Sequence, residues 1–369
     1  ALTLVYFVLP AFNILTGKQI ELPLYAVWFW FVIAVLIGVT GVVAGSYPAF
    51  FLSAFHPVKV LKGSLKAGPR AAMLRKGLVV FQFALSIMLI LGTVIVSQQV
   101  NFLQSKNIGY NRANLVSFTL EGNLVNKNNY QLFKQEALKV AGIQEITRIT
   151  QVPLNMQTGT SDIGWQGKNP EEKYLFTWAS VGYDFSKTLN LEMVDGRDFS
   201  KGFPTDSNAL IINETALRLI KYENPIGKKM QFWGRDWTIA GVVKDFHFNS
   251  LHEPIRPLLM YLGENDSWGS ALVRVEPAKT DKALASLAKL AKELNPKFPF
   301  YYQFIDEEYR KMYMNEQFTK KLSGYFAFLA IFICCLGLLG LVMFTIEQCV
   351  KEIGIRKILG ANSLSLFSR

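Results

Sequence analysis

The sequence is poor in cysteine. It has three, Cys334, Cys335 and Cys349, and none occurs in the long polar stretch from 98 to 321. A disulfide framework is therefore excluded as the source of that stretch's stability. Its 224 residues are enough to bury a sizeable core, so we expect packing to stabilise it. Cys334 and Cys335 lie inside an apolar run, where a cysteine behaves as a small apolar residue.

The sequence also lacks the motifs of nucleotide binding and ester hydrolysis. GxxxxGK[ST] does not occur, which excludes a phosphate-binding loop of the Walker type. Asn224–Lys229 (NPIGKK) lacks the first glycine and the final serine or threonine, and Leu322–Gly324 matches only the start of the LSGGQ signature. GxSxG is absent too. We expect no catalytic residue and no cofactor, and any ATPase must be another chain or another part of this one.

Two of the three histidines are close together, in KDFHFNSLHEPIRP. A metal site at His247 and His252 is one interpretation, but a spacing of five does not place both on one helical face. We expect instead that Asp245, His247 and Ser250 hydrogen-bond a turn that closes the core, with no metal. A bound metal, or a substrate-sized apolar pocket lined by both histidines, would indicate a membrane-bound enzyme.

Long apolar runs dominate the rest of the chain. Leu24–Phe55, Gly77–Val96 and Tyr325–Ile346 each have about 20 or more residues without a charged side chain. That length crosses a bilayer and exceeds an ordinary buried helix. A fourth run, Ala1–Thr16, is short and begins without methionine, so we interpret it as the end of a truncated span. It has neither the basic start nor the cleavage site of a signal peptide.

The cations predict the orientation of these runs, because Lys and Arg of short loops stay on the cytoplasmic side. Residues 56–76 contain six cations and no acid, so this linker is expected in the cytoplasm. One crossing of the membrane from Gly77 then places residues 98–321 outside the cytoplasm. The next crossing returns Lys351, Arg356 and Lys357 to the cytoplasm.

The net charge of +11 follows from the same topology. Residues 98–321 contain 28 Lys and Arg against 25 Asp and Glu, a balance of +3, so the other +8 belongs to the membrane and cytoplasmic parts. A nucleic-acid-binding protein is expected to gather its cations on one soluble face. The near-neutral outer part argues against a nucleic-acid partner.

Helical and strand patterns alternate within 98–321, which predicts a mixed α+β domain. Apolar residues spaced by three and four predict amphipathic helices at Tyr130–Val140 and Lys279–Leu294. Ser97–Lys106 and Glu307–Leu322 are expected to continue the neighbouring spans as helical stalks. The predicted fold is a membrane protein in which a large α+β domain is inserted between two α-helical spans.

Short β-rich runs predict the strands of this domain. They are Leu115–Leu120, Tyr174–Val181, Ala209–Asn213, Met230–Trp233, Thr238–Val243, Ala271–Val275 and Phe300–Ile305. Gly234 and Arg235 stand where a tight hairpin is expected to turn.

The segment after the last apolar run has the pattern of a short basic helix. In Lys351–Ala361 (KEIGIRKILGA), Ile355, Ile358 and Leu359 predict an apolar side, and Glu352 and Arg356 form an i, i+4 pair. The following Gly360 suits a helix end. From the residues alone, an anchor on anionic lipid and a docking helix for a partner are equally good interpretations.

Four strings resemble one family. They are RKGLVVFQFALSIMLILGTVIVSQQ at 75–99, IINETALRLIKYENPIGKKM at 211–230, GVVKDFHFNSLHEPIRP at 241–257 and KEIGIRKILGAN at 351–362. Together they resemble permeases of the MacB/FtsX superfamily, and more closely the duplicated, ATPase-free permeases frequent in Bacteroidota. The resemblance covers nearly the whole chain. One departure is Gln348–Val350, where members often have a basic pair.

The resemblance implies a layout in which the chain is an internal fragment of a duplicated permease. The expected parts are the last two spans of a first half (1–55, the first of them truncated), a basic cytoplasmic linker (56–76), a span (77–97), a periplasmic MacB-like domain with helical stalks (98–321), a span (322–346), and the cytoplasmic coupling helix with the start of the following segment (347–369).

The resemblance also implies a function, mechanotransmission. A cytoplasmic ABC ATPase presses on the coupling helix, and the spans move the periplasmic domain of an inner-membrane, multi-pass exporter of peptides, drugs or lipoproteins. Ile355 and Leu359 are expected to seat in the ATPase, and Gly360 to end the helix. The expected coupling residues are Glu352, Ile353, Gly354, Ile355, Arg356, Lys357, Leu359, Gly360 and Ala361, with Glu352, Arg356 and Lys357 orienting the contact by charge.

Further partners are implied in the same way: a second permease half or homodimer mate, membrane lipids, and a periplasmic adaptor or cargo. The resemblance leaves one alternative open. Some relatives are non-transporting regulators of the FtsX type, in which the outer domain activates a cell-wall hydrolase or a sensor partner.

Overall fold

The structure, a computed structural model, describes residues 2–53 and 69–358. The chain divides into two units. Ala1–Val100 and Glu316–Arg369 form the first, here named the helical unit, and Asn101–Asn315 form the second, here named the α+β unit.

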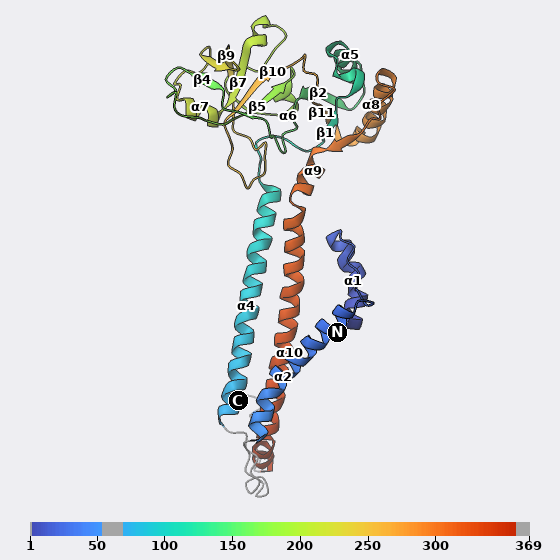
Figure 1. Cartoon of the computed structure of the whole chain (residues 1–369), viewed down its shortest axis with the longest axis vertical. Helices are drawn as coiled ribbons and strands as arrows, with labels where there is room; N and C mark the ends of the chain where they lie inside the picture. Colours follow the sequence, from blue (N-terminus) through green and yellow to red (C-terminus); the bar gives the residue numbers. More distant parts are fainter. Residues whose placement is uncertain (1, 54–68, 359–369) are drawn as a thin grey trace. The chain divides into compact units, whose positions relative to one another are not determined.

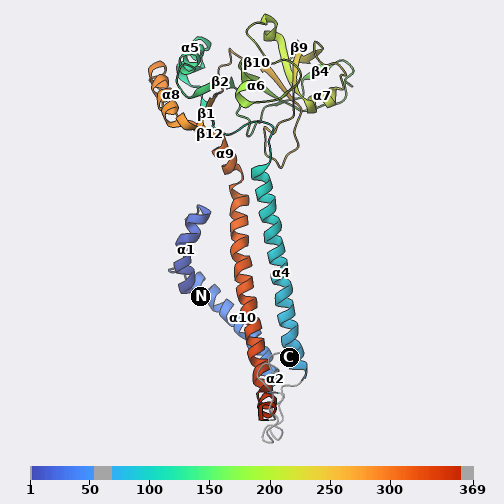
Figure 2. The same ribbon diagram turned by 180° about the vertical axis from the view of Figure 1, so that it is seen from behind.

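Four helices make up the described part of the helical unit (Figure 1). They are α1 (Leu2–Thr16), α2 (Val27–Ser53), α4 (Pro69–Ser105) and α10 (Met314–Ile358), of which α4 ends and α10 begins in the other unit. The helices α4 and α10 run side by side, as the opposite view also shows (Figure 2).

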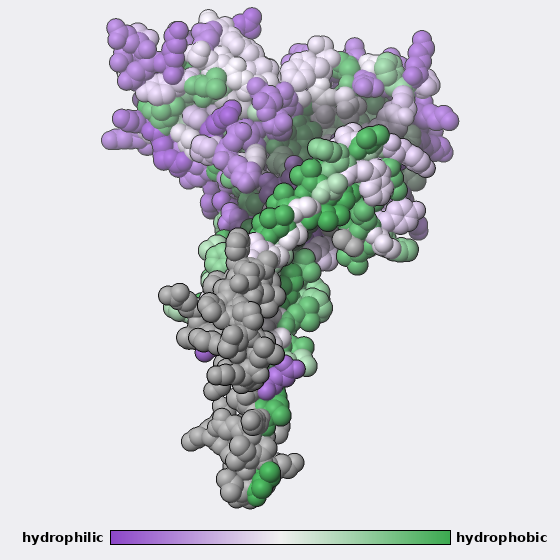
Figure 3. All heavy atoms as spheres, turned by 60° about the horizontal axis from the view of Figure 1, so that its bottom comes forward, coloured by the Kyte–Doolittle hydropathy of each residue, from purple (hydrophilic) through white to green (hydrophobic). Residues whose placement is uncertain are grey.

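Three of these helices are long and apolar enough to cross a membrane: Val27–Ser46, Lys76–Ser105 and Met314–Glu347. At most 11% of their most apolar stretch is buried against protein. Exposed apolar side chains over such lengths require lipid rather than water around them. Figure 3 shows this contrast, with apolar side chains along the helices and many polar side chains over the α+β unit. The three predicted spans are therefore matched by helices, and Leu2–Ile14 is a shorter apolar helix.

The α+β unit is built on one twelve-stranded sheet, whose main path is β12-β1-β11-β2-β5-β10-β7-β9-β8-β4. One end of this sheet forms a first lobe of four antiparallel strands. Its strands are β1 (Leu115–Thr119), β2 (Ile143–Ile149), β11 (Ser270–Val275) and β12 (Tyr302–Phe304). The helices α5 (Lys127–Ala137) and α8 (Thr280–Leu294) pack on it. The order β1-α5-β2 then β11-α8-β12 is that of two split βαβ units, a ferredoxin-like connection.

The amphipathic helices owe their positions to apolar stripes at helical spacing. On α8, Ala283, Leu284, Leu287 and Ala291 are buried in the core that the first lobe forms. The start of α5 is fixed by Asn126, whose side chain accepts a hydrogen bond from the backbone N–H of Asn128. This N-cap satisfies a donor that the first turn of a helix leaves without a partner.

Residues between β2 and β11 form a second lobe. Its strands are β3 (Gly159–Thr160), β4 (Ile163–Trp165), β5 (Phe176–Val181), β6 (Met193–Gly196), β7 (Ala209–Asn213), β8 (Lys229–Phe232), β9 (Arg235–Val243) and β10 (Leu258–Leu262). It also contains α6 (Phe185–Leu189) and α7 (Glu214–Ile220). Two strand pairs, β5 with β10 and β7 with β9, are parallel. The last element of the α+β unit is α9 (Ile305–Met312).

The predicted α+β class is confirmed, and each predicted strand overlaps an observed one. Two local predictions were wrong. The second stalk is not continuous, because Tyr313 leaves helical geometry between α9 and α10. The hairpin of β8 and β9 turns at Trp233 and Gly234, both with positive φ, and Arg235 already pairs with Phe232.

Candidate functional site

The predicted coupling residues lie at the end of the longest helix. The helix α10 continues without a break from its membrane candidate, Met314–Glu347, to Ile358. Six predicted residues are therefore in its last turns, namely Glu352, Ile353, Gly354, Ile355, Arg356 and Lys357. The other three, Leu359, Gly360 and Ala361, lie outside the described residues.

Helix geometry sets which of these residues share a side. Because each residue turns by about 100° around the axis, Glu352 and Arg356 lie on one side of α10. Ile355 and Ile358 lie together on a neighbouring side, and the side chain of Ile358 is exposed. The helical backbone fixes only these relative positions, and the role of the residues in coupling stays a prediction.

Within the helical unit, α10 packs closely on α4. Ser86 Oγ lies 2.9 Å from Cys334 Sγ, and Thr93 Oγ1 donates a hydrogen bond of 3.1 Å to the carbonyl oxygen of Ser323. At Gly337 a Cβ atom would stand 3.0 Å from Gln82 Oε1. Small residues on α10 therefore allow the polar side chains of α4 to approach, a common arrangement between membrane helices.

A second feature, here named the stalk junction, holds the end of α4 inside the α+β unit. The Tyr309 hydroxyl of α9 donates a hydrogen bond of 2.9 Å to the carbonyl of Leu103. Arg112 donates one of 2.6 Å to the carbonyl of Gln104, and its guanidinium lies 3.9 Å from the centre of the Tyr309 ring. Both carbonyls belong to the last four of α4, which have no partner within the helix. The stalk junction is thus a side-chain cap on α4.

The neighbouring Tyr313 joins the stalk junction to the loop 244–257. Its hydroxyl accepts a hydrogen bond of 2.8 Å from the backbone N–H of Leu251, and its ring centre lies 5.0 Å from that of Tyr309. Burial is the main cause that raises the pKa of Tyr309, so its phenol stays protonated and able to donate at neutral pH. This cap was not predicted from the sequence, because Tyr309 and its acceptor Leu103 are 206 positions apart.

The loop 244–257 is held by buried aromatics and by backbone bonds. Phe246 and Phe248 are fully or almost fully buried. Asp245 accepts hydrogen bonds from the backbone N–H and the hydroxyl of Thr215, at 2.9 and 2.8 Å, and so fixes the first turn of α7. The backbone N–H of His247 donates to Ile108, 2.7 Å away. The prediction for this loop holds only in part. Ser250 Oγ accepts a hydrogen bond of 3.3 Å from the backbone N–H of His252 and so supports a turn, whereas Asp245 binds α7 and His247 is held through its backbone.

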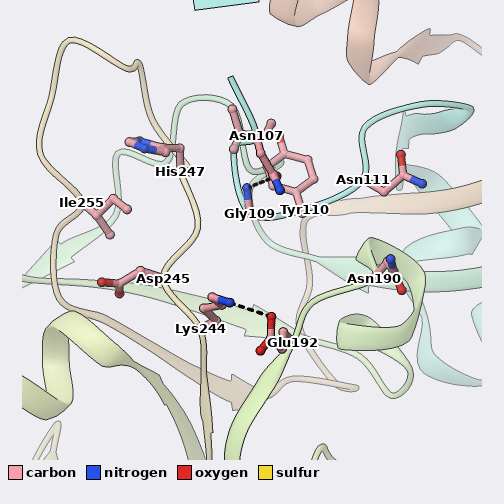
Figure 4. A pocket seen from close by; sticks show the side chains of 11 residues that line it. Asn107, Gly109, Tyr110, Asn111, Asn190, Glu192, Lys244, Asp245, His247 and Ile255 are labelled. Carbon is pink, nitrogen blue, oxygen red and sulfur yellow. Dashed lines mark hydrogen bonds and ion pairs between the residues drawn. The ribbon is translucent and has the colours of Figure 1, made fainter. Parts of the chain in front are cut away.

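The two histidines of this loop have different surroundings. His247 borders a polar cleft of 630 Å³, in which Lys244 and Glu192 form an ion pair of 2.8 Å (Figure 4). Burial, and then Lys106, lower the pKa of His247, while Asp245 partly opposes them. His252 instead has its ring 5.9 Å from that of Tyr313. In the described part of the chain, no three residues that ligate metals are grouped together.

Comparison with known proteins identifies the domain. Residues 77–290 match the family model of the MacB-like periplasmic core domain. The macrolide export ATP-binding/permease protein MacB of Aggregatibacter actinomycetemcomitans is 25% identical over 199 residues, which cover 51% of this chain and 31% of that protein. The match thus spans about a third of the length of that relative.

Solved structures resemble the chain at low identity. The periplasmic region of MacB from Actinobacillus actinomycetemcomitans has a TM-score of 0.40 at 19% identity, covering 57% of this chain and 97% of that one. The extracellular domain of the noncanonic ABC-type transporter YknZ from Gram-positive bacteria has a TM-score of 0.35 at 17% identity. That match covers 47% of this chain and 87% of that one. A domain of a permease protein from Porphyromonas gingivalis has a TM-score of 0.35 at 16% identity, and the match covers 53% of this chain and 92% of that one.

Proposed function

Because the chain belongs to the MacB-like periplasmic core domain family, we propose that it is a permease subunit of an ABC transporter working by mechanotransmission. In this proposal a separate cytoplasmic ATPase supplies the energy, and the chain moves its periplasmic domain. The working assembly contains a second permease half or a second copy. The cargo is a peptide, a drug or a lipoprotein handled on the periplasmic side.

The observation that supports this proposal most is the unbroken course of α10. Its 45 residues have a length of roughly 67 Å, whereas the hydrocarbon core of a bilayer is about 30 Å thick. A helix of this length extends well beyond the core. Displacement of its cytoplasmic end therefore moves its other end as well, since the hydrogen bonds of a helix resist bending.

The charges favour the cytoplasm for the end of this helix. Lys351, Arg356 and Lys357 follow the apolar segment directly, and such cations remain on the inner side. In the proposal Ile355 and Leu359 enter a groove of the ATPase, and Glu352 orients the contact together with the cations. The inner membrane of a bacterium is then the location of the chain, with the α+β unit in the periplasm.

Charge reversal at Arg356 tests this role. We expect Arg356→Glu, in the intact permease copurified with its ATPase, to abolish the coupling of ATP hydrolysis to transport while membrane insertion stays normal. Lys62→Glu is the matched control, because it reverses a cation of the basic linker. If both variants lower membrane association equally, the segment is a lipid anchor; unchanged ATPase stimulation in Arg356→Glu removes its coupling role.

A further inference from the structure

Four aromatic rings from four separate segments meet at one end of the second lobe. Trp178 comes from β5 and Tyr261 from β10, the strand that pairs with it. Trp233 is at the turn of the β8–β9 hairpin, and Trp268 lies in the loop before β11. We name these four residues the aromatic cluster.

The rings of the aromatic cluster are arranged as a floor with two walls. Trp178 and Tyr261 are inclined by 33°, with centres 6.1 Å apart. Trp233 stands at 75° to Trp178 with centres 5.0 Å apart, and Trp268 stands at 84° with centres 6.4 Å apart. The buried ring of Phe232 is stacked on Trp233, with centres 4.1 Å apart, which fixes this wall.

The two walls are unusual in exposure and in backbone conformation. Trp233 is 46% exposed and Trp268 is 45% exposed, although large aromatic side chains gain stability when buried. Trp233 also has φ +52°, in the left-handed region that bulky residues rarely occupy. Residues with a strained backbone cluster at ligand-binding and active sites, so an exposed aromatic residue in this conformation indicates a binding surface.

Acidic groups lie beside the aromatic cluster. Of the aromatic cluster, Tyr261 alone borders a cleft of 280 Å³, which Glu264, Asp266 and Lys127 also border. Burial, followed by the charge of Asp266, raises the pKa of Tyr261 to about 12, with partial opposition from Ser180. The Oδ2 atom of Asp266 is buried and accepts no hydrogen bond. An ammonium group with an N–H can supply the missing donor, whereas a quaternary ammonium contributes only its positive charge.

Glu264 and the neighbouring Arg148 are already engaged. The guanidinium of the buried Arg148 donates to the backbone carbonyls of Glu264 and Asp266, at 3.1 and 2.8 Å. The carboxylate of Glu264 accepts a hydrogen bond from Gln131. Asp266 is therefore the acid beside the rings whose carboxylate keeps an unused acceptor.

We propose that the aromatic cluster and Asp266 form a binding site for an organic ammonium group. The faces of indole and phenol rings are electron-rich, and several rings around one cation are the usual way to bind a substituted ammonium. The carboxylate of Asp266 adds an opposite charge and an acceptor. A neutral apolar ligand would use the rings but not the acid, and an anion would be repelled by both. The site does not depend on the proposed coupling to an ATPase.

The test is a titration of the full chain in nanodiscs of phosphatidylethanolamine and phosphatidylglycerol, lipids without a trimethylammonium group. Choline is the probe, 3,3-dimethylbutan-1-ol is its neutral counterpart of the same shape, and binding is followed by saturation-transfer NMR and tryptophan fluorescence. We expect saturable choline binding that is at least tenfold stronger than that of the alcohol. Butylamine, titrated in parallel, distinguishes a quaternary ammonium source from a lysine-like one.

Variants connect the binding to these residues. Trp268→Ala and Trp233→Asn each remove a wall, and asparagine is at ease in the left-handed turn, so the fold is kept. Each should weaken choline binding roughly fivefold, equal to about 1 kcal/mol, and Asp266→Asn should weaken it comparably. Tyr301→Ala, at another exposed aromatic residue (76%), should change nothing. Equal binding of choline and the alcohol, no saturation, or unchanged affinity in all three variants would overturn the proposal.

Discussion

Removal of a single hydroxyl at the stalk junction should loosen the end of α4. In Tyr309→Phe the ring and its contact with Arg112 remain, but the carbonyl of Leu103 loses the donor that lies 2.9 Å away. Leu103 and Tyr309 are each only 4% exposed, so water does not readily replace that donor. A buried acceptor without a partner costs about 1–2 kcal/mol, which is a change of about 5- to 30-fold in a local opening equilibrium.

Hydrogen exchange followed by mass spectrometry measures this opening directly. Peptides covering residues 101–106 should exchange about 5 to 30 times faster in Tyr309→Phe, while peptides from the second lobe keep their rates. Tyr301→Phe, which removes a hydroxyl from a residue that is 76% exposed, is the control and should leave all rates unchanged. If residues 101–106 exchange at the original rate in Tyr309→Phe, then Tyr309 does not cap α4.

Two further predictions concern packing and pH. Gly337→Leu should lower the thermal unfolding midpoint of the solubilised chain by several degrees, because its Cβ would press on Gln82. Gly340→Leu is the control and should leave the midpoint unchanged, since no heavy atom lies within 4 Å of its Cβ position. Equal midpoints in the two variants would contradict the close packing of α10 on α4. His247 has a pKa below its usual 6.5, so below pH 6.5 the unfolded chain binds more protons than the folded one. The free energy of unfolding should therefore decrease as the pH falls from 6.5 to the lowered pKa, and this histidine should have no effect on it above pH 6.5. Denaturation at pH 5.5 and 7.5 should show a smaller pH effect in His247→Gln, and an unchanged effect would assign it to other groups.

The elements that the sequence predicted best are those with a strong local pattern. The apolar spans, the helix at Thr280–Leu294 and the strand at Ala209–Asn213 need only hydrophobic periodicity or a short apolar run, and each is found. The strand Ile143–Ile149 was missed because it contains polar residues. Its Arg148 is 2% exposed and is satisfied by carbonyls more than 100 positions away. Long-range partners of this kind leave no local signal.

The functional sites also differ in whether they depend on a local pattern or on partners distant in the chain. The proposed coupling segment is a short string that stands out in the sequence. Its backbone is helical up to Ile358, and its coupling role stays a prediction. The stalk junction and the aromatic cluster are assembled from segments distant in the chain, so only the fold reveals them. Trp233 is the sharpest case, since turn rules place glycine or asparagine at its position and therefore moved the predicted hairpin by one residue.

The proposed mechanism requires the α+β unit and the end of α10 to lie on opposite sides of a membrane. Single-cysteine labelling tests it, after Cys334, Cys335 and Cys349 are replaced by alanine. Lys289→Cys, on the exposed side of α8, and Lys357→Cys, in the last turn of α10, are treated in intact spheroplasts with a thiol reagent that does not cross membranes. We predict that residue 289 is labelled at once and residue 357 only after permeabilisation. Labelling of both in intact spheroplasts would contradict the proposed mechanism.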